Sequence, residues 1–309
     1  MSQFNEDNTV EQLFIDSLKK NGWKYIPSHE LPRDYSDVIV EPMVKAALIR
    51  LNPEIAEDPS RADEVIYKLR GMLQPFPSDN LVAQNEAFKK KLFEENSYPF
   101  GEDGRSTSIS FFGTMTKEEL DKNEYVVTNQ WEYPVESKNG GKRLDLVLLI
   151  NGFPVAIGEL KTPVRNAISW LDGAQDIADY EKSIPEMFVP NVFNFASEGK
   201  CYRYGSVNMP LTKWGPWHTP DHKAEGSLAD VRISIADMLT PEKVVDIMQF
   251  FTLFSTDKKH RKIKIICRYQ QYEAANLIVE RVKENKIKQG LIWHFQGSGK
   301  SLFCLLYTS

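Results

Sequence analysis

Hydrophobic residues along the chain change from helical to strand-like spacing near residue 124. In the first part they recur every three to four positions, as on the buried face of a helix. The segments that follow instead have short apolar runs bounded by turn residues. The sequence therefore predicts helices at 9–21, 41–52, 61–73 and 79–93, and then strands at 125–135, 143–150 and 154–160.

The pattern beyond residue 160 alternates between the two types of element. It predicts a helix at about 166–182, strands at 187–197 and 200–206, an ordered loop at 208–227, helices from 229 and at 240–254, a buried strand within 258–268, a helix at 269–285 and a strand at 289–295. We place a domain boundary at the basic stretch, giving domains 1–257, with a sheet over about 124–206, and 258–309. The fold class is α/β, a mixed sheet flanked by helices.

Composition indicates a soluble globular protein, with 41% hydrophobic and 26% charged residues in 309. No apolar run approaches the roughly 20 residues of a membrane helix, and the polar start does not resemble a signal peptide. The cysteines Cys201, Cys267 and Cys304 lack paired spacing, which favours a cytoplasmic location over a disulfide framework. His218 and His222 have no cysteine nearby and are expected to be loop residues rather than zinc ligands.

Net charge gives no overall attraction to nucleic acid, because the chain carries −5 at pH 7. DNA binding needs only a local basic face. Segment 258–268 has six Lys or Arg in eleven residues. It is either a contact with DNA phosphates or a solvated linker, and we favour the contact.

Asp145, Glu159 and Lys161 form the first candidate for chemistry. The tripeptide acid-x-Lys alone is weak evidence, since it occurs six times in the chain, starting at Glu136, Glu159, Glu198, Asp221, Asp257 and Glu284. Only the copy at Glu159 ends a strongly apolar strand that follows a second such strand with an embedded acid. A buried charge is costly unless it is paired or binds a metal. Two carboxylates on adjacent strands can hold Mg²⁺, and a nearby ammonium can stabilise developing charge. An ordinary ion pair at a sheet edge is the alternative.

The register of the hairpin tests this hypothesis. A two-residue turn at Asn151-Gly152 sets Asp145 opposite Gly158, which puts the two acids on opposite faces. A three-residue turn sets Asp145 opposite Glu159. We therefore predict an odd-length loop or a bulge.

The segment KRLDLVLLINGFPVAIGELKTP resembles the core of the PD-(D/E)xK nuclease superfamily, and specifically the N-terminal domain of type I restriction-enzyme restriction (motor) subunits. The similarity extends through NQWEY before it and DGAQDIADYEKSIPEMFVPNVFNFAS after it. Leu144 stands where the superfamily name has proline. The resemblance implies that Asp145 and Glu159 bind Mg²⁺ and that Lys161 assists the attacking water.

The resemblance also implies supporting residues on two helices. RecB-like relatives carry Gln-x-x-x-Tyr after the core, whereas here Gln175 and Tyr180 have four residues between them. Asp176 has the one-turn spacing to Tyr180. The family often places an acid on its first helix, for which Glu11 is the best match.

A phosphate-binding loop is the second candidate. HFQGSGKS follows an apolar strand and precedes a predicted helix, the context that such a loop requires. The backbone at Gly297, Ser298 and Gly299 could approach a triphosphate, Lys300 could reach the β- and γ-phosphates, and Ser301 could bind Mg²⁺. His294 stands where the usual first glycine falls.

This loop resembles the first motif of superfamily 2 helicases, which implies the start of a RecA-like ATPase domain. Gln270 or Gln271 is the candidate for adenine contact, with an amphipathic helix surface as the alternative. Later ATPase motifs are missing from these 309 residues, so we interpret the chain as an N-terminal fragment.

The sequence thus predicts a Mg²⁺-dependent endonuclease domain of an ATP-dependent type I restriction enzyme. The resemblance implies double-stranded DNA as substrate, ATP as a cofactor of the full-length protein, and modification and specificity subunits as partners. A helicase or translocase fragment whose first domain only binds DNA or docks partners is the alternative. An ATP-dependent nuclease of another restriction type is a second one.

Overall fold

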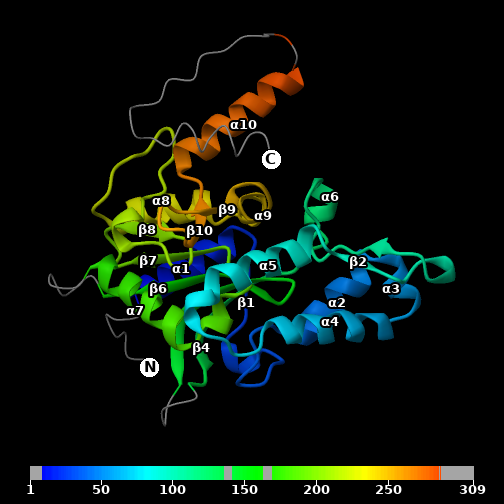
Figure 1. Cartoon of the computed structure of the whole chain (residues 1–309). Helices are drawn as coiled ribbons and strands as arrows, with labels where there is room; N and C mark the ends of the chain where they lie inside the picture. The colour runs from blue at the N-terminus through cyan, green and yellow to red at the C-terminus, as the bar shows by residue number, and fades with distance from the viewer. Residues whose placement is uncertain (1–8, 136–140, 163–168, 285, 287–309) are drawn as a thin grey trace.

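A mixed six-stranded sheet forms the centre of the molecule (Figure 1). The computed structural model describes residues 9–135, 141–162, 169–284 and 286. The strand order is β1-β4-β5-β6-β7-β8, with β1–β4 and β6–β7 parallel and the other neighbours antiparallel. The strands are β1 (Lys24–Tyr25), β4 (Tyr125–Tyr133), β5 (Lys142–Ile150), β6 (Phe153–Leu160), β7 (Phe193–Ser197) and β8 (Tyr202–Gly205). The predicted α/β class with a mixed sheet is confirmed.

The central strands are buried on both faces, as their continuous apolar runs predict. Leu146 to Ile150 are fully buried on β5, and all residues from Phe153 to Ile157 are buried on β6. The turn between them is the predicted Asn-Gly turn, with positive φ at Asn151 (52°) and Gly152 (85°). These angles match the hairpin turn whose twist suits antiparallel strands.

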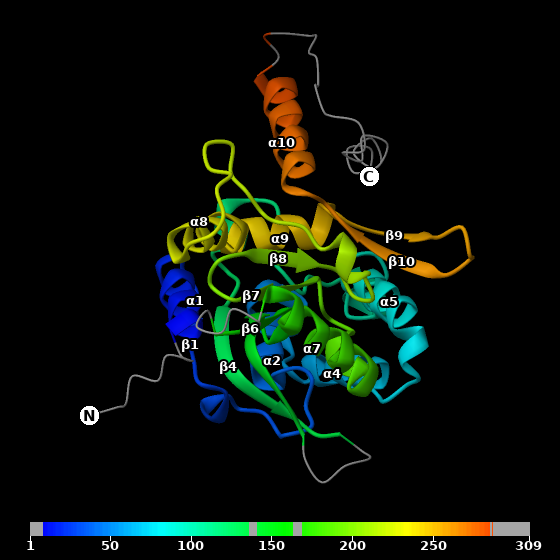
Figure 2. The same ribbon diagram turned by 90° about the vertical axis from the view of Figure 1, so that its left-hand side faces the viewer.

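Helices α1 (Thr9–Lys20) and α7 (Trp170–Ser183) cover opposite faces of the sheet (Figure 2). On one face Phe14 of α1 stacks on Phe195 of β7, with ring centroids 5.5 Å apart. On the other face Gly173 of α7 lies so close to β6 that a Cβ there would be 3.1 Å from the backbone oxygen of Glu159. Helix α7 is therefore held against the strand that carries Glu159.

The N-terminal helices gather beside this sheet (Figure 1). They are α2 (Glu41–Leu51), α3 (Pro53–Glu57), α4 (Ser60–Met72), α5 (Leu81–Phe93) and α6 (Lys117–Leu120), with a short ribbon of β2 (Ser97–Tyr98) and β3 (Thr107–Ser108). Their buried faces join the same hydrophobic core as the sheet. Three of these helices, α2, α4 and α5, match the predicted segments closely, whereas the pattern did not predict α3 and α6.

The C-terminal part contains α8 (Leu228–Met238), α9 (Pro241–Phe250), the hairpin of β9 (Thr252–Thr256) and β10 (Lys262–Ile266), and α10 (Tyr269–Glu284). The predicted helix at 240–254 is wrong after residue 250. The Thr252 hydroxyl donates to the backbone oxygens of Ile247 and Met248, so it occupies carbonyls at the helix end and the chain leaves as a strand. The predicted strand at 187–197 is also wrong in its first half, where residues 185–188 form a 3-10 helix.

The predicted boundary between residues 257 and 258 falls in the turn of the β9–β10 hairpin. The second strand packs on the first part of the chain: the Ser206 hydroxyl donates to the backbone oxygen of Lys264 at 2.7 Å, and the Tyr204 hydroxyl to that of Cys267 at 2.7 Å. Residues up to 267 therefore belong to the same body as the sheet, and α10 extends away from it (Figures 1 and 2). None of the helices in the described ranges has the length and apolarity to cross a membrane.

Candidate active site

A β-bulge brings Asp145 and Glu159 to the same place on the sheet. The pairing runs Ile150–Phe153 and Leu149–Pro154, then shifts so that Leu148 pairs with Ala156. One extra residue on β6 is thereby absorbed, as in a bulge. The turn has two residues, which alone would set Asp145 opposite Gly158. The bulge shifts the register by one residue and sets Asp145 opposite Glu159. The prediction of an odd-length loop or a bulge is confirmed.

Beyond the bulge the two acids interact directly. The backbone N–H of Asp145 donates to Glu159 Oε1 at 3.3 Å, and the backbone N–H of Leu160 donates to Asp145 Oδ2 at 2.8 Å. Each carboxylate therefore reaches across to the other's strand. Glu159 is 2% exposed, whereas Asp145 is partly exposed at the strand edge.

The electrostatics of this pair favour a bound cation. Burial raises the pKa of Glu159 well above its ordinary value, and the neighbouring charge of Asp145 raises it further. Lys161 opposes this effect, and its Nζ lies 3.6 Å from Glu159 Oε2. Two close carboxylates in a region of low dielectric are destabilised when both are ionised, and positive charge placed between them removes that cost.

Lys161 bridges two acids from different elements. Its Nζ donates to Asp176 Oδ2 on α7 at 2.5 Å, besides lying near Glu159. Burial alone would lower the pKa of Lys161, but the hydrogen bond to Asp176 and the charge of Glu159 outweigh it, so that the pKa is raised. The ammonium is therefore held in its charged form.

Helix α7 presents Asp176, and not Gln175, to this group. The helix starts with a capping box between Ser169 and Asp172, and the Gly173 contact described above sets its distance from β6. Gln175 is exposed and donates to Asp179 at 3.3 Å, one turn further along. Adjacent helical residues differ by about 100° in direction, so in this structure Asp176 is the α7 side chain that contacts Lys161.

Tyr180 lies one turn after Asp176 and faces the same cluster. Burial raises its pKa, and the charges of Glu159, Asp176 and Asp145 raise it further. Its hydroxyl is therefore a neutral donor. Lys142 Nζ lies 5.2 Å from the centre of the Tyr180 ring.

Glu11 lies at the start of α1 and contacts β4. Its carboxylate accepts hydrogen bonds from the side-chain amides of Asn129 at 2.7 Å and Gln130 at 2.9 Å. Gln130 has a φ of 54°, which is rare for a residue with a side chain and breaks the pairing of β4 with β5 at the position of Asp145. Glu11 thus supports the strand beside Asp145 through its hydrogen bonds with these two amides.

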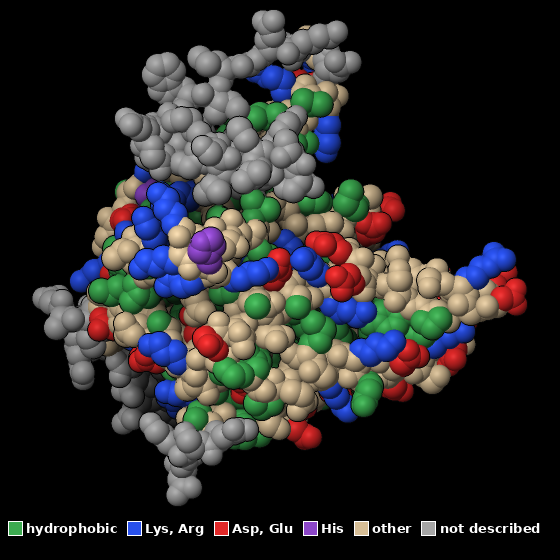
Figure 3. All heavy atoms as spheres, in the orientation of Figure 1, with side chains coloured by type: hydrophobic (Ala, Val, Ile, Leu, Met, Phe, Trp, Pro, Cys, Tyr) green, Lys and Arg blue, Asp and Glu red, His purple; other side chains and the backbone are tan. Residues whose placement is uncertain are grey.

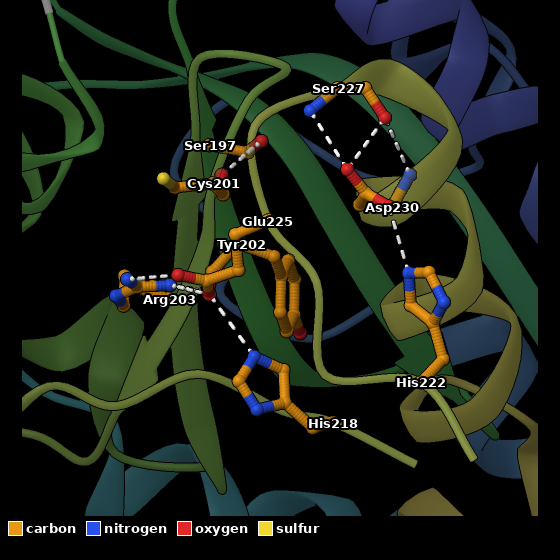
Figure 4. Close-up of polar contacts among 9 residues, drawn as sticks. All are labelled: Ser197, Cys201, Tyr202, Arg203, His218, His222, Glu225, Ser227 and Asp230. Carbon is orange, nitrogen blue, oxygen red and sulfur yellow. Dashed lines mark hydrogen bonds and ion pairs between the residues drawn. The ribbon is translucent and has the colours of Figure 1, made fainter.

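The histidines of the loop at 208–227 pair with carboxylates, as Figure 4 shows. His218 Nε2 lies 3.2 Å from Glu225 Oε1, and His222 Nε2 lies 2.8 Å from Asp230 Oδ1. His222 therefore ties the loop to α8, while His218 contacts Glu225 within the loop, and Arg203 of β8 holds that carboxylate. Both histidines are loop residues, as predicted.

The predicted nucleotide-binding residues fall largely outside the described part of the chain. Gly297, Ser298, Gly299, Lys300 and Ser301 all lie there. Of the two adenine candidates on α10, Gln271 is 3% exposed and accepts a hydrogen bond from the backbone N–H of Arg268 at 2.8 Å. Gln270 is partly exposed at the first turn.

Comparison with known proteins identifies the family. The sequence model described as "Type I restriction enzyme R protein N terminus" matches residues 3–213. The chain belongs to this family. A second model, of the SWI2/SNF2 ATPase, matches residues 270–309.

Curated relatives agree with this assignment. The chain is 29% identical to the type I restriction enzyme HindI endonuclease subunit of Haemophilus influenzae, over 98% of this chain and 30% of that protein. It is 25% identical to the putative type I restriction enzyme MjaIXP endonuclease subunit of Methanocaldococcus jannaschii, over 99% of this chain and 31% of that protein. The chain thus spans about 30% of the length of these relatives. It is an N-terminal portion of a type I restriction R subunit.

Proposed function

We propose that this chain carries the Mg²⁺-dependent endonuclease centre of a type I restriction enzyme, of the PD-(D/E)xK type, and that it hydrolyses phosphodiester bonds of double-stranded DNA. The observation that carries the proposal is the convergence of Asp145, Glu159 and Lys161 through the bulge in β6. An ordinary ion pair at a strand end does not require a buried carboxylate such as Glu159 next to a second carboxylate.

The donor set fits Mg²⁺. This ion is commonly bound by one or two carboxylates and completes its shell with water and substrate phosphate. Asp145 and Glu159 supply two such carboxylates, one buried and one partly exposed. Within the described ranges no group of three or more His, Cys, Asp and Glu side chains is arranged to hold a metal.

The protein side chains then have separate roles. Asp145 and Glu159 hold the cation, which when bound supplies Lewis acidity toward the phosphate. The charged ammonium of Lys161 stabilises the negative charge that develops during attack and orients the water. The neutral hydroxyl of Tyr180 donates a hydrogen bond to the bound DNA, and Glu11 supports β4 by accepting a hydrogen bond from Gln130.

The whole enzyme supplies what these residues lack. The ATPase match at 270–309 supports ATP binding by Lys300 and Ser301, and DNA translocation by the full-length subunit before cleavage. The relatives are named as endonuclease subunits of type I restriction enzymes, which supports a restriction complex. We propose that modification and specificity subunits complete it, and that it works in the cytoplasm.

Cleavage by the assembled enzyme tests the proposal. The variants Asp145→Asn and Lys161→Ala are assembled with the partner subunits and given closed circular plasmid, ATP and Mg²⁺. We expect cleavage to fall by at least about 100-fold, while ATP hydrolysis continues. Asp179→Asn, a change of the same kind at an exposed position of α7, serves as the control. Wild-type cleavage by the Asp145 variant would show that this domain only binds DNA or docks partners.

Metal binding gives a second readout on the 309-residue chain itself. Titration calorimetry with Mn²⁺ or Mg²⁺ should detect a site that Asp145→Asn abolishes and Asp179→Asn keeps. Equal metal binding by the Asp145→Asn and Asp179→Asn variants would show that Asp145 is not a metal ligand.

A further inference from the structure

The tip of the β9–β10 hairpin is an exposed basic feature of the described chain. Four positive side chains and one carboxylate lie within six residues, at Asp257, Lys258, Lys259, Arg261 and Lys262. Figure 3 shows Lys and Arg side chains gathered on this face, and Figure 2 shows the hairpin extending beyond the body. The chain as a whole carries −5, so this is a local reversal of sign.

The turn at the tip is built by Asp257. Its Oδ1 accepts the backbone N–H groups of Lys259 at 2.8 Å and Arg261 at 2.9 Å, and its Oδ2 accepts the Arg261 guanidinium at 2.8 Å. His260 completes the turn with a φ of 60°. One carboxylate thus orders the loop and leaves the lysine side chains outside it.

The hairpin is also fastened to the body. Lys262 pairs with Glu86 of α5. Lys264 is buried and donates from Nζ to the backbone oxygen of Asn191 at 2.5 Å. A two-stranded ribbon is marginal by itself, and these contacts hold it in a fixed position. The basic stretch is therefore part of an ordered hairpin held at a fixed position on the body, and not a solvated linker.

Lys258 and Lys259 are the side chains left for a partner. Both are exposed, and neither has an ion-pair partner within the residues that the structure describes. Ordering of the turn lowers the conformational cost of engaging them, because the backbone that carries them is already fixed.

We propose that the β9–β10 hairpin contacts the phosphate backbone of duplex DNA through Lys258 and Lys259, without reading its sequence. The choice of DNA as partner rests on the proposed nuclease function. A two-stranded ribbon has the width of a DNA groove. The tip, residues 257–262, has no Phe, Tyr or Trp on which single-stranded bases could stack, which favours a duplex over a single strand.

Salt-dependent binding tests the proposal. A labelled duplex of arbitrary sequence is titrated with the 309-residue chain, and its fluorescence anisotropy is followed from about 50 to 200 mM salt, the range in which phosphate contacts change affinity steeply. In Lys258→Ala/Lys259→Ala, affinity should fall on the order of tenfold or more near 100 mM salt. The slope of log K against log[salt] should become shallower by about two, because two phosphate contacts are lost.

Matched variants separate a contact from a general loss of charge. Lys19→Ala/Lys20→Ala removes two adjacent exposed lysines at the end of α1 and should bind as the wild type does. Lys258→Arg/Lys259→Arg keeps both charges and should restore the affinity and the slope. Unchanged binding by the hairpin alanine variant, an equal loss in the Lys19/Lys20 variant, or no duplex binding by the wild type would each overturn the proposal.

Failure of this inference and failure of the nuclease proposal give different results. Asp145→Asn should keep duplex binding and lose cleavage in the assembled enzyme. If only the Lys258/Lys259 alanine variant loses duplex binding, the DNA contact of the hairpin is supported, whether or not the assembled enzyme cleaves DNA.

Discussion

The buried carboxyl of Glu181 makes the stability of the fold depend on pH. It lies on α7 directly after Tyr180 and is 5% exposed. Its oxygens accept hydrogen bonds from the side-chain amide of Asn194 at 3.1 Å and from the backbone N–H of Asn208 at 3.0 Å. Burial outweighs these bonds and raises its pKa to about 8.

The raised pKa fixes the sign of the effect. Between its ordinary pKa of 4.5 and the folded value of about 8, the folded chain holds a proton on Glu181 that the unfolded chain releases. The contribution to stability is full below the unfolded pKa and is lost as the pH rises through the folded one. One proton corresponds to a slope of about −1.4 kcal/mol per pH unit in the free energy of unfolding. From pH 5.5 to 7.5 that is roughly 3 kcal/mol.

Urea unfolding of the chain at several pH values measures this term as a difference between variants. Glu181→Gln does not titrate, so the wild-type free energy minus that of the variant should fall by roughly 3 kcal/mol across this range. The absolute stability of the Glu181→Gln variant is not used, because the new side-chain NH2 group would face the N–H donors of Asn194 and Asn208 and change the stability at every pH. Burial lowers the pKa of Lys264, which acts with the opposite sign, and this term largely cancels because both proteins contain it.

A control and a refuting result complete the test. Glu280→Gln makes the same change at an exposed position of α10, and its pH profile should parallel that of the wild type. If the difference between wild type and Glu181→Gln stays flat from pH 5.5 to 7.5, burial does not hold Glu181 protonated and the reasoning is refuted.

Two further substitutions probe packing and the site. Gly158→Ala should destabilise the chain by about 1–3 kcal/mol or more in urea unfolding, because its Cβ would lie 2.1 Å from a ring carbon of Phe195; a loss under about 0.5 kcal/mol would contradict this packing. Asp176→Asn removes the charge that holds Lys161 and should lower the maximal cleavage rate of the assembled enzyme about tenfold or more, with KM for DNA unchanged. Asp179→Asn, on the same helix, should cut normally, and equal rates for the two variants would exclude a role for Asp176.

The hairpin at the site shows what sequence alone could predict. The apolar runs set β5 and β6, and Asn151-Gly152 set a two-residue turn. By strand periodicity this turn separates Asp145 from Glu159. A break in the strand register was required only by the chemical argument that two acids must lie on the same face of the sheet to bind one cation. The bulge at β6 supplies it.

Other features could not be predicted because they depend on contacts distant in sequence. The basic stretch 258–268 predicts one strand after a linker, but whether it forms a hairpin depends on where the preceding helix ends. That end is set by Thr252, whose hydroxyl turns back to the helix. From the sequence Lys264 cannot be told from a surface lysine. In the structure it is buried, and its Nζ donates a hydrogen bond to the backbone oxygen of Asn191, 73 residues earlier.

The choice between Gln175 and Asp176 illustrates the same dependence within the site. Motif spacing does not decide between them, since Asp176 lies one turn before Tyr180 and Gln175, the residue type of the motif, lies one position further away. Packing decides between them: Gly173 fixes how near α7 lies to β6, and Glu181 ties the far end of the helix to the sheet interior. Because both ends are held, the orientation of α7 about its own axis is fixed, and in this orientation Asp176 contacts Lys161. The position of the ammonium thus depends on interior contacts that no motif contains.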